Sequence, residues 1–244
     1  LLPAANRLAD WHQSRDGINS LVVTTNQVFQ EFSGGQPHPA AIRDMVKMYY
    51  DRAGSDSAAR PRYLLLFGDA SFDYKNRLPG NTNQVPAYES RNSLDPLSSF
   101  VSDDFYGFLD DADDINVLSA GDQLDIGIGR IPAATLSAAN DYVDKLELYH
   151  QPAARGEWRN ELSFIADDED FNLHLRDAEE ITARVLATNN RFQLRKIYLD
   201  AYLQESDAAG SRYPAVNQAI SDGMQGGNLI WNYSGHGGFR RLAE

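Results

Sequence analysis

Cysteine is absent from the 244 residues. This excludes disulfide bonds, thiolate metal sites and any thiol nucleophile within the sequence. It also removes the usual compositional guide to compartment, because proteins of the cell surface and of the cytosol can both lack cysteine.

Long apolar runs are missing too. No stretch approaches the roughly 18 consecutive apolar residues that a membrane-spanning helix needs. The first ten residues lack the basic region and the apolar stretch of a signal peptide. We therefore expect a soluble piece with no direct membrane span, whose start is cut from something longer.

Positive charge is scarce as well. Lys and Arg number 22 against 35 Asp and Glu, which gives a formal net charge of -13. Such a surface repels nucleic acid and anionic lipid and attracts cations. We expect no nucleic-acid partner.

The rest of the composition is that of a folded protein, with 42% hydrophobic and 23% charged residues. Short β-branched or aromatic runs alternate with segments of helical period, which predicts an α/β fold with a mostly parallel sheet and helices on both faces. Strands are expected at residues 21–25, 63–67, 124–129, 162–166, 194–199 and 228–233. Helices are expected at residues 39–53, 136–150, 173–185 and 214–226.

Two segments stand apart from this alternation. Residues 69–121 are rich in Asp, Asn, Ser and Pro and are too long for a passive connection, so we expect a functional or metal-braced excursion. Residues 151–159 carry Pro152 and Gly156 after a long helix and predict a boundary between two α/β subdomains, 1–150 and 151–244.

The motif that carries chemistry is NLIWNYSGHGG at residues 228–238, where an apolar strand runs into a glycine-flanked histidine, His236. Ligands of parallel sheets bind at the carboxyl ends of strands, and glycines there allow close approach of a substrate backbone. Histidine transfers protons near neutral pH. The simpler interpretation is a strand that ends in a flexible turn with an incidental histidine.

This motif resembles the gingipain branch of the caspase-like cysteine peptidases. The similarity covers nearly the whole chain, and within the family it is strongest to the sortase of the bacterial type IX secretion system. The strings that carry it are NYSGHGG, TTNQVFQEFSGG, AAIRDMVKMYYDRAG, RYLLLFGDASFD, SDDFYGFLDD and DIGIGRIPA. The resemblance implies a caspase/gingipain-like α/β/α sandwich, with residues 1–150 as the N-terminal subdomain and 151–244 as the first part of the catalytic subdomain.

The resemblance also implies roles for individual residues. His236 matches the catalytic histidine, and the amide of Gly237 matches an oxyanion-hole donor. Glu169 is aligned with the carboxylate that orients the histidine, although Asp167 and Asp168 are close enough to compete. His174 falls near the position where arginine-specific relatives bind the substrate with an acidic residue, which puts arginine specificity in doubt. Trp231 is expected to pack or to floor the cleft as a substrate contact.

Carboxylates crowd the long excursion, and Asp110, Asp111 and Asp113 are the candidate ligands of a structural calcium ion. Their spacing does not match an EF-hand, and a solvated acidic loop is the default alternative. The resemblance implies that calcium binding is possible, because gingipain relatives bind calcium. No cofactor is expected for catalysis itself.

The expected function is therefore part of a cysteine endopeptidase or transpeptidase that removes C-terminal secretion signals from exported proteins and attaches those proteins to the cell surface. The family's nucleophile lies beyond Glu244, so the 244 residues are expected to be inactive alone. The resemblance implies the outer surface of a Gram-negative bacterium, with other secretion-system subunits as partners. The alternatives are a non-catalytic gingipain-like scaffold and, with less support, a calcium-stabilised adhesive module.

Overall fold

The structure is a computed structural model that describes residues 1–73, 75, 77–92, 94–95, 98–119, 122–208, 210–237 and 242. The chain forms two compact units, Leu1–Tyr149 and His150–Glu244. Each unit has its own parallel sheet and its own buried core. The mixed α/β class predicted from the alternation of strands and helices is confirmed.

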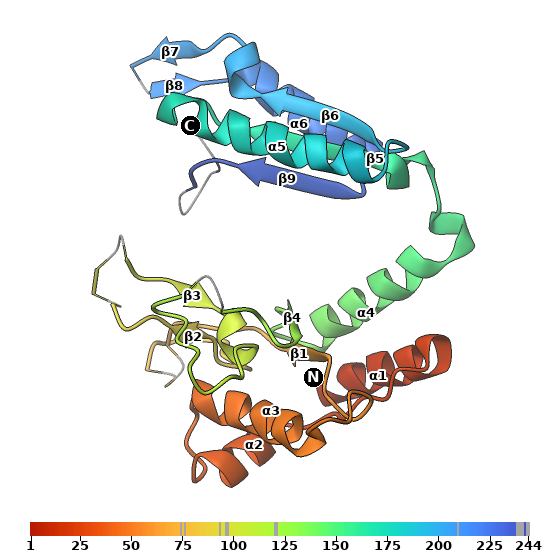
Figure 1. Ribbon diagram of the computed structural model, residues 1–244, viewed down its shortest axis with the longest axis vertical. Helices are drawn as coiled ribbons and strands as arrows, with labels where there is room; N and C mark the ends of the chain where they lie inside the picture. Colours follow the sequence, from red (N-terminus) through yellow and green to blue (C-terminus); the bar gives the residue numbers. More distant parts are fainter. Residues whose placement is uncertain are drawn as a thin grey trace. The chain divides into compact units, whose positions relative to one another are not determined.

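The first unit builds its core from helices and a two-stranded sheet (Figure 1). Its main elements are α1 (Leu2–Asp16), α2 (Thr25–Phe32), α3 (Pro39–Ala53), β1 (Tyr63–Phe67), β4 (Gly127–Ile131) and α4 (Leu136–His150). Strand β1 pairs in parallel with β4, from Tyr63 opposite Gly127 to Phe67 opposite Ile131. Val28, Phe29, Ile42 and Leu66 pack together between α2, α3 and β1.

The strand expected at residues 21–25 is wrong, because this stretch leads into helix α2. Thr24 accepts a hydrogen bond from the Gln27 amide at 3.3 Å, and the Gln27 side chain accepts one from the Thr24 amide at 2.9 Å. This reciprocal capping box satisfies two free amides of a helix end. It outweighs the β-branched composition of the preceding residues.

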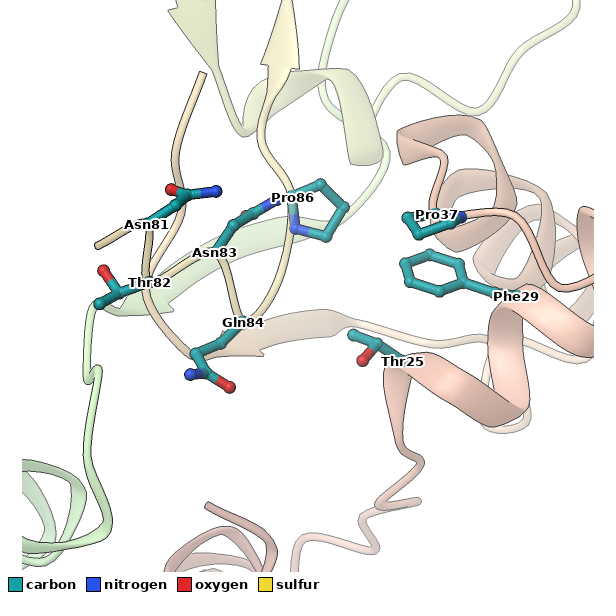
Figure 2. Close-up of a pocket in the computed structure, with 8 residues that line it drawn as sticks. All are labelled: Thr25, Phe29, Pro37, Asn81, Thr82, Asn83, Gln84 and Pro86. Atoms are coloured by element: carbon teal, nitrogen blue, oxygen red, sulfur yellow. The ribbon is translucent and has the colours of Figure 1, made fainter. Parts of the chain in front are cut away.

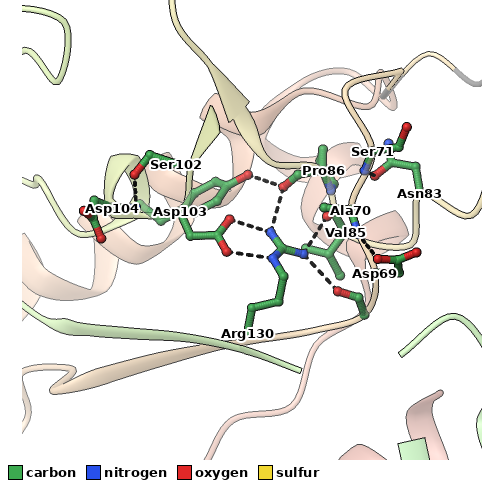
Figure 3. Close-up of polar contacts among 12 residues, drawn as sticks. Asp69, Ala70, Ser71, Asn83, Val85, Pro86, Ser102, Asp103, Asp104 and Arg130 are labelled. Carbon is green, nitrogen blue, oxygen red and sulfur yellow. Dashed lines mark hydrogen bonds and ion pairs between the residues drawn. The ribbon is translucent and has the colours of Figure 1, made fainter. Parts of the chain in front are cut away.

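The long excursion between β1 and β4 is fastened by one arginine (Figure 3). It contains β2 (Tyr88–Glu89), β3 (Val101–Ser102) and the 3-10 helix η1 (Asp104–Tyr106). Arg130 donates from Nε and Nη2 to the two Asp103 carboxylate oxygens at 2.7 and 2.6 Å. Its Nη1 donates to the carbonyls of Gly68 and Val85 at 2.9 and 2.8 Å. In the described part of this segment, the Arg130 guanidinium, which is 12% exposed, is thus a main support of the fold.

The second unit is a three-stranded parallel sheet in the order β6-β5-β9. Its elements are β5 (Glu161–Ala166), α5 (Leu173–Thr188), β6 (Gln193–Tyr198), the hairpin β7 (Glu205–Asp207) and β8 (Gly210–Arg212), α6 (Pro214–Gly226) and β9 (Ile230–Ser234), with 3-10 helices η2 (Pro152–Ala154), η3 (Glu157–Asn160), η4 (Asp170–Asn172) and η5 (Leu199–Ala201). Helices α5 and α6 lie on opposite faces of the sheet (Figure 1). The central strand β5 is buried from Leu162 to Ala166, as a strand covered on both faces must be.

Side chains along the strands alternate between the two faces of the sheet, and each face packs against one helix. Ile165 and Ile197 pack with Tyr213 and Val216 on the α6 side. On the other side the Tyr198 hydroxyl donates to Glu179 of α5 at 2.7 Å. The sheet is therefore closed on both faces and open only at its edges and strand ends, which is where a site must form.

Candidate functional site

The site forms at the carboxyl ends of β5 and β9. These strands pair in parallel up to Ala166 opposite Ser234, and the Asp167 amide donates to the Ser234 carbonyl at 2.9 Å. The register therefore brings Asp167, the first residue after β5, beside Gly235 and His236, which follow β9. Carboxyl ends of parallel strands are where ligands of α/β sheets bind.

Asp167 is a buried carboxylate that holds the loop carrying His236. Its Oδ2 accepts the His236 amide at 3.1 Å and lies 3.3 Å from the Tyr233 hydroxyl, whose one proton goes to the closer His236 carbonyl. The same oxygen lies 3.7 Å from His236 Nδ1, and the Asp167 side chain is only 7% exposed. A buried carboxylate needs such donors, and these donors fix the position of the histidine backbone.

The Nε2 side of the His236 imidazole contacts Asp170 and His174. His236 Nε2 lies 3.1 Å from Asp170 Oδ2, and His174 Nε2 lies 3.2 Å from the same oxygen. The two imidazole rings meet edge to face, with centroids 5.1 Å apart. The structure thus brings the two candidate histidines together around one carboxylate oxygen.

A left-handed turn presents Asp170 to the rings. Glu169, Asp170, Phe171 and Asn172 all have positive φ, between 43° and 68°. A non-glycine residue pays about 1–2 kcal/mol for this conformation. Helix α5 begins directly after the turn, so Asp170 and His174 lie four residues apart on one side of the chain.

Two tyrosines support the loops of the site. The Tyr233 hydroxyl donates to the His236 carbonyl at 2.6 Å, and the Tyr213 hydroxyl contacts Asp168 at 2.5 Å. Gly235 is required by close packing, because a Cβ there would lie 2.5 Å from the Cβ of Asp167. The glycine before His236 thus serves the approach of two loops within the protein.

For the remaining predicted site residues, the structure gives no contact with the His236 ring among the described residues. Glu169 begins the left-handed turn, and the carboxylates found at the His236 ring among the described residues are Asp167 and Asp170. Trp231 packs with the α6-side core, where its ring meets Gly223. Gly237 forms an isolated antiparallel bridge with Leu242. Gly238, the last residue of the motif, lies outside the described residues.

Sequence reasoning missed Asp170 as a partner of both histidines. The only signal was the short separation of Asp170 and His174 in the sequence, since the positive-φ turn that brings them together has no helical spacing to reveal it. Tyr213 and Tyr233 were also missed as supports. They read as core aromatics, since nothing in the sequence places their hydroxyls near Asp168 and Asp167.

The acidic loop does not gather its carboxylates. Asp113 Oδ2 accepts the Asp110 amide at 3.0 Å, whereas Asp111 pairs with Lys47 at 3.1 Å. Burial raises the pKa of Asp113, and the nearby Asp110, Asp122 and Asp125 carboxylates raise it further. As placed, Asp110, Asp111 and Asp113 do not fit the six to eight converging oxygens of a calcium site.

A shallow pocket in the first unit is lined mainly by amide and hydroxyl side chains around Phe29 (Figure 2). Three of these side chains form hydrogen bonds within the long segment between β1 and β4. Asn81 donates to the Asp73 carbonyl at 2.7 Å, Thr82 donates to Asp69 at 2.6 Å, and Asn83 accepts the Ser71 amide at 3.3 Å. The polar side chains of the pocket are therefore better explained as supports of the loop than as a reaction site.

The second unit thus defines an α/β domain with a histidine on a buried carboxylate at the carboxyl edge of its sheet, the arrangement of a proton-transfer site. A match to peptidase family C25 covers residues 1–244. The chain belongs to this family, the gingipain family of cysteine peptidases.

A solved relative supports the assignment. The chain is 34% identical to latent dimeric PorU from Porphyromonas gingivalis, with a TM-score of 0.55 over 65% of this chain and 15% of that one. The chain therefore spans only a small part of that protein. No curated protein matches the chain. Among the described residues, no helix is long and apolar enough to cross a membrane.

Proposed function

We propose that this chain supplies the histidine half of the active site of a cysteine endopeptidase or transpeptidase of the sortase type. The observation that carries the proposal is the fixed position of His236, whose amide rests on buried Asp167 at the carboxyl edge of the sheet. Membership in peptidase family C25 supports a thiol nucleophile. These residues contain no cysteine, so the nucleophile comes from outside them.

The proposed reaction uses the two ring nitrogens of His236 differently. Asp167 Oδ2 lies on the Nδ1 side at 3.7 Å, whereas Nε2 lies 3.1 Å from Asp170 Oδ2. In the proposed reaction Asp170, which is 46% exposed, releases Nε2, and Nε2 then takes the thiol proton while Nδ1–H faces Asp167. The thiolate attacks the scissile carbonyl, and the Gly237 amide donates to the oxyanion. The imidazolium then protonates the leaving amine, and a thioester remains. Water completes hydrolysis, whereas an amine completes transpeptidation.

We assign the orienting role to Asp167, although the family alignment favoured Glu169. Asp167 contacts the His236 loop directly, whereas Glu169 stands at the start of the positive-φ turn, and the ion pairs of His236 among the described residues are with Asp167 and Asp170. Asp167→Asn and Glu169→Gln in the full-length protein separate the two assignments. We expect a large fall in kcat with little change in KM for Asp167→Asn, and near wild-type kinetics for Glu169→Gln. The reverse order would restore Glu169.

The proposed substrates are exported proteins that carry C-terminal secretion signals, and the proposed location is the outer surface of a Gram-negative cell, among other secretion-system subunits. Similarity to PorU supports this context. His174 lies beside His236 and is proposed to contact substrate there. Substrate contact by Trp231 and calcium binding by the acidic loop stay predictions. Calcium titration of the chain against Asp113→Asn tests the latter.

The test replaces His236 with Ala in the full-length protein and follows cleavage of the C-terminal signal from an exported substrate. General-base catalysis is worth about 10²–10⁴ in rate, so we expect cleavage to fall by at least about 100-fold. His12→Ala is the matched control, because His12 also pairs with an aspartate, Asp16, but lies in the first unit.

The same cleavage assay is carried out on a second variant of the full-length protein. In this variant, the first Cys on a strand after residue 244 is replaced by Ala. If both variants fold and neither cleaves the signal, the result supports the proposed cysteine peptidase function. Cleavage that survives both changes, or the lack of such a cysteine, would make the domain a non-catalytic scaffold.

A further inference from the structure

The edge of the second sheet carries a side-chain cluster that the proposed peptidase chemistry does not use as a whole. Asp170, His174 and His236 each offer one ligand atom, and these atoms lie within 4.8 Å of one another. No other group of three or more His, Asp or Glu side chains converges in this way within the described part of the chain.

Two of the three distances among these atoms match the ligand spacing of a tetrahedral metal site. Asp170 Oδ2 lies 3.2 Å from His174 Nε2 and 3.1 Å from His236 Nε2. Around an ion bound at about 2.0–2.1 Å, tetrahedral ligands lie roughly 3.3 Å apart. Two edges of the triangle are therefore already near the required length. The third edge, between the two imidazole nitrogens, is within 4.8 Å.

The donor set selects the class of cation. Two imidazoles and one carboxylate suit zinc and neighbouring transition metals, whereas calcium and magnesium require oxygen ligands. Three protein ligands with an open fourth position, as here, are typical of zinc sites that keep a water. The net charge of -13 favours any cation over an anion.

The surroundings supply the support that such sites need. A metal-bound imidazole almost always directs its second nitrogen to a carboxylate or carbonyl, which fixes the tautomer. Asp167 Oδ2 lies 3.7 Å from His236 Nδ1 and is held by the His236 amide. Asp170 and His174 are four residues apart across the positive-φ turn that leads into α5, and their side chains lie 3.2 Å apart, so their spacing is set by local structure.

The geometry points to a divalent transition-metal site of the zinc class, formed by Asp170, His174 and His236. The site joins the turn before α5 to the end of β9. It needs no residue outside the described chain and no peptidase activity. It goes beyond the proposed function, although it uses the same nitrogen of His236.

The test titrates Zn²⁺ into the chelator-treated 244-residue chain by calorimetry at neutral pH, followed by Co²⁺ with visible absorption as a reporter of tetrahedral coordination. The chain has no cysteine, so thiolates cannot contribute to the binding. The variants are His174→Ala and Asp170→Asn. The control is His12→Ala, which removes a histidine paired with Asp16 at 2.8 Å but without a third ligand.

We expect one Zn²⁺ per chain, a higher Tm with zinc, and no competition from Ca²⁺ in excess. Loss of a second-shell partner weakens metal affinity about 10–100-fold, so loss of a direct ligand should weaken it at least as much. His12→Ala should bind as the unaltered chain does, and circular dichroism checks that each variant folds.

Failure to bind zinc, or unchanged affinity in His174→Ala and Asp170→Asn, would overturn the proposal. Loss of binding in Asp113→Asn would also overturn it, because that result would place the ion at the acidic loop. No substrate is present in the titration. A negative result therefore leaves the peptidase proposal intact, and a failed cleavage assay leaves the metal site intact.

Discussion

Removal of the Asp167 carboxylate tests whether the site is built into the fold or only lies on its surface. Asp167 accepts hydrogen bonds from the His236 amide at 3.1 Å and the Asp168 amide at 3.2 Å, and its Oδ2 lies 3.3 Å from the Tyr233 hydroxyl. A bond to a charged group contributes about 1.5–3 kcal/mol. These bonds are long and their donors can reach water, so we expect Asp167→Ala to cost about 2–4 kcal/mol in total.

Asp170→Ala is the matched comparison, because it removes the other carboxylate at the same imidazole. The Asp170 side chain is 46% exposed, and its partners here are the two histidine rings. Exposed ion pairs contribute about 0–1 kcal/mol. The two substitutions should therefore differ clearly in stability although both contact His236.

The assay must report on the second unit alone, since two compact units can unfold separately. Native-state hydrogen exchange of amides in β5 gives the free energy of unfolding of that unit, because β5 is its central buried strand. Exchange of the His236 amide adds a local measure of the Asp167 contact. If Asp170→Ala destabilised the unit as much as Asp167→Ala, or if both cost under 1 kcal/mol, the reasoning would be refuted.

Three further predictions follow from contacts elsewhere. Gly235→Ala should destabilise the second unit by about 1–3 kcal/mol through overpacking. Gly237→Ala should be near neutral, because its Cβ would lie 3.4 Å from Leu242, an ordinary contact. Urea unfolding measures both variants. Arg130→Ala should cost the first unit about 1.5–3 kcal/mol by removing the hydrogen bonds to Asp103, again in urea; a cost below 1 kcal/mol would contradict the assigned role. Hydrogen bonds from Lys196 and Tyr198 lower the pKa of Glu179, so the stability advantage of the native protein over Glu179→Gln should be full above the ordinary glutamate pKa and disappear as pH falls through the lowered value; thermal melts across that range test the sign.

Element ends were predictable where short-range chemistry fixes them. Helix α6 (Pro214–Gly226) has proline at its first position and glycine at its end, and its expected bounds agree with the structure. Helix α1 was missed because few of its residues face a core, with Ala4 and Leu8 its buried ones. Residues 21–25 were misassigned because β propensity is a weak signal beside a capping box.

The location of the site was also predictable, but the choice among its acidic residues was not. A strand that ends in a glycine-flanked histidine places His236 at the carboxyl edge of the sheet. Four successive acidic residues, Asp167 to Asp170, follow the neighbouring strand, and only backbone direction separates them. Asp167 continues the ladder by bonding to Ser234, whereas Glu169 leaves it through a positive φ. That difference arises from tertiary pairing.

The two ring nitrogens of His236 have unequal neighbours, and this asymmetry connects both proposals. Asp167, on the Nδ1 side, is 7% exposed and is held through the His236 amide, so it cannot leave without disturbing the loop. Asp170, on the Nε2 side, is 46% exposed and is held by weaker contacts. Nε2 is therefore the nitrogen whose partner can be exchanged. A thiol proton and a zinc-class cation would compete for that atom, so the cation must be removed by a chelator before the base function of His236 is measured.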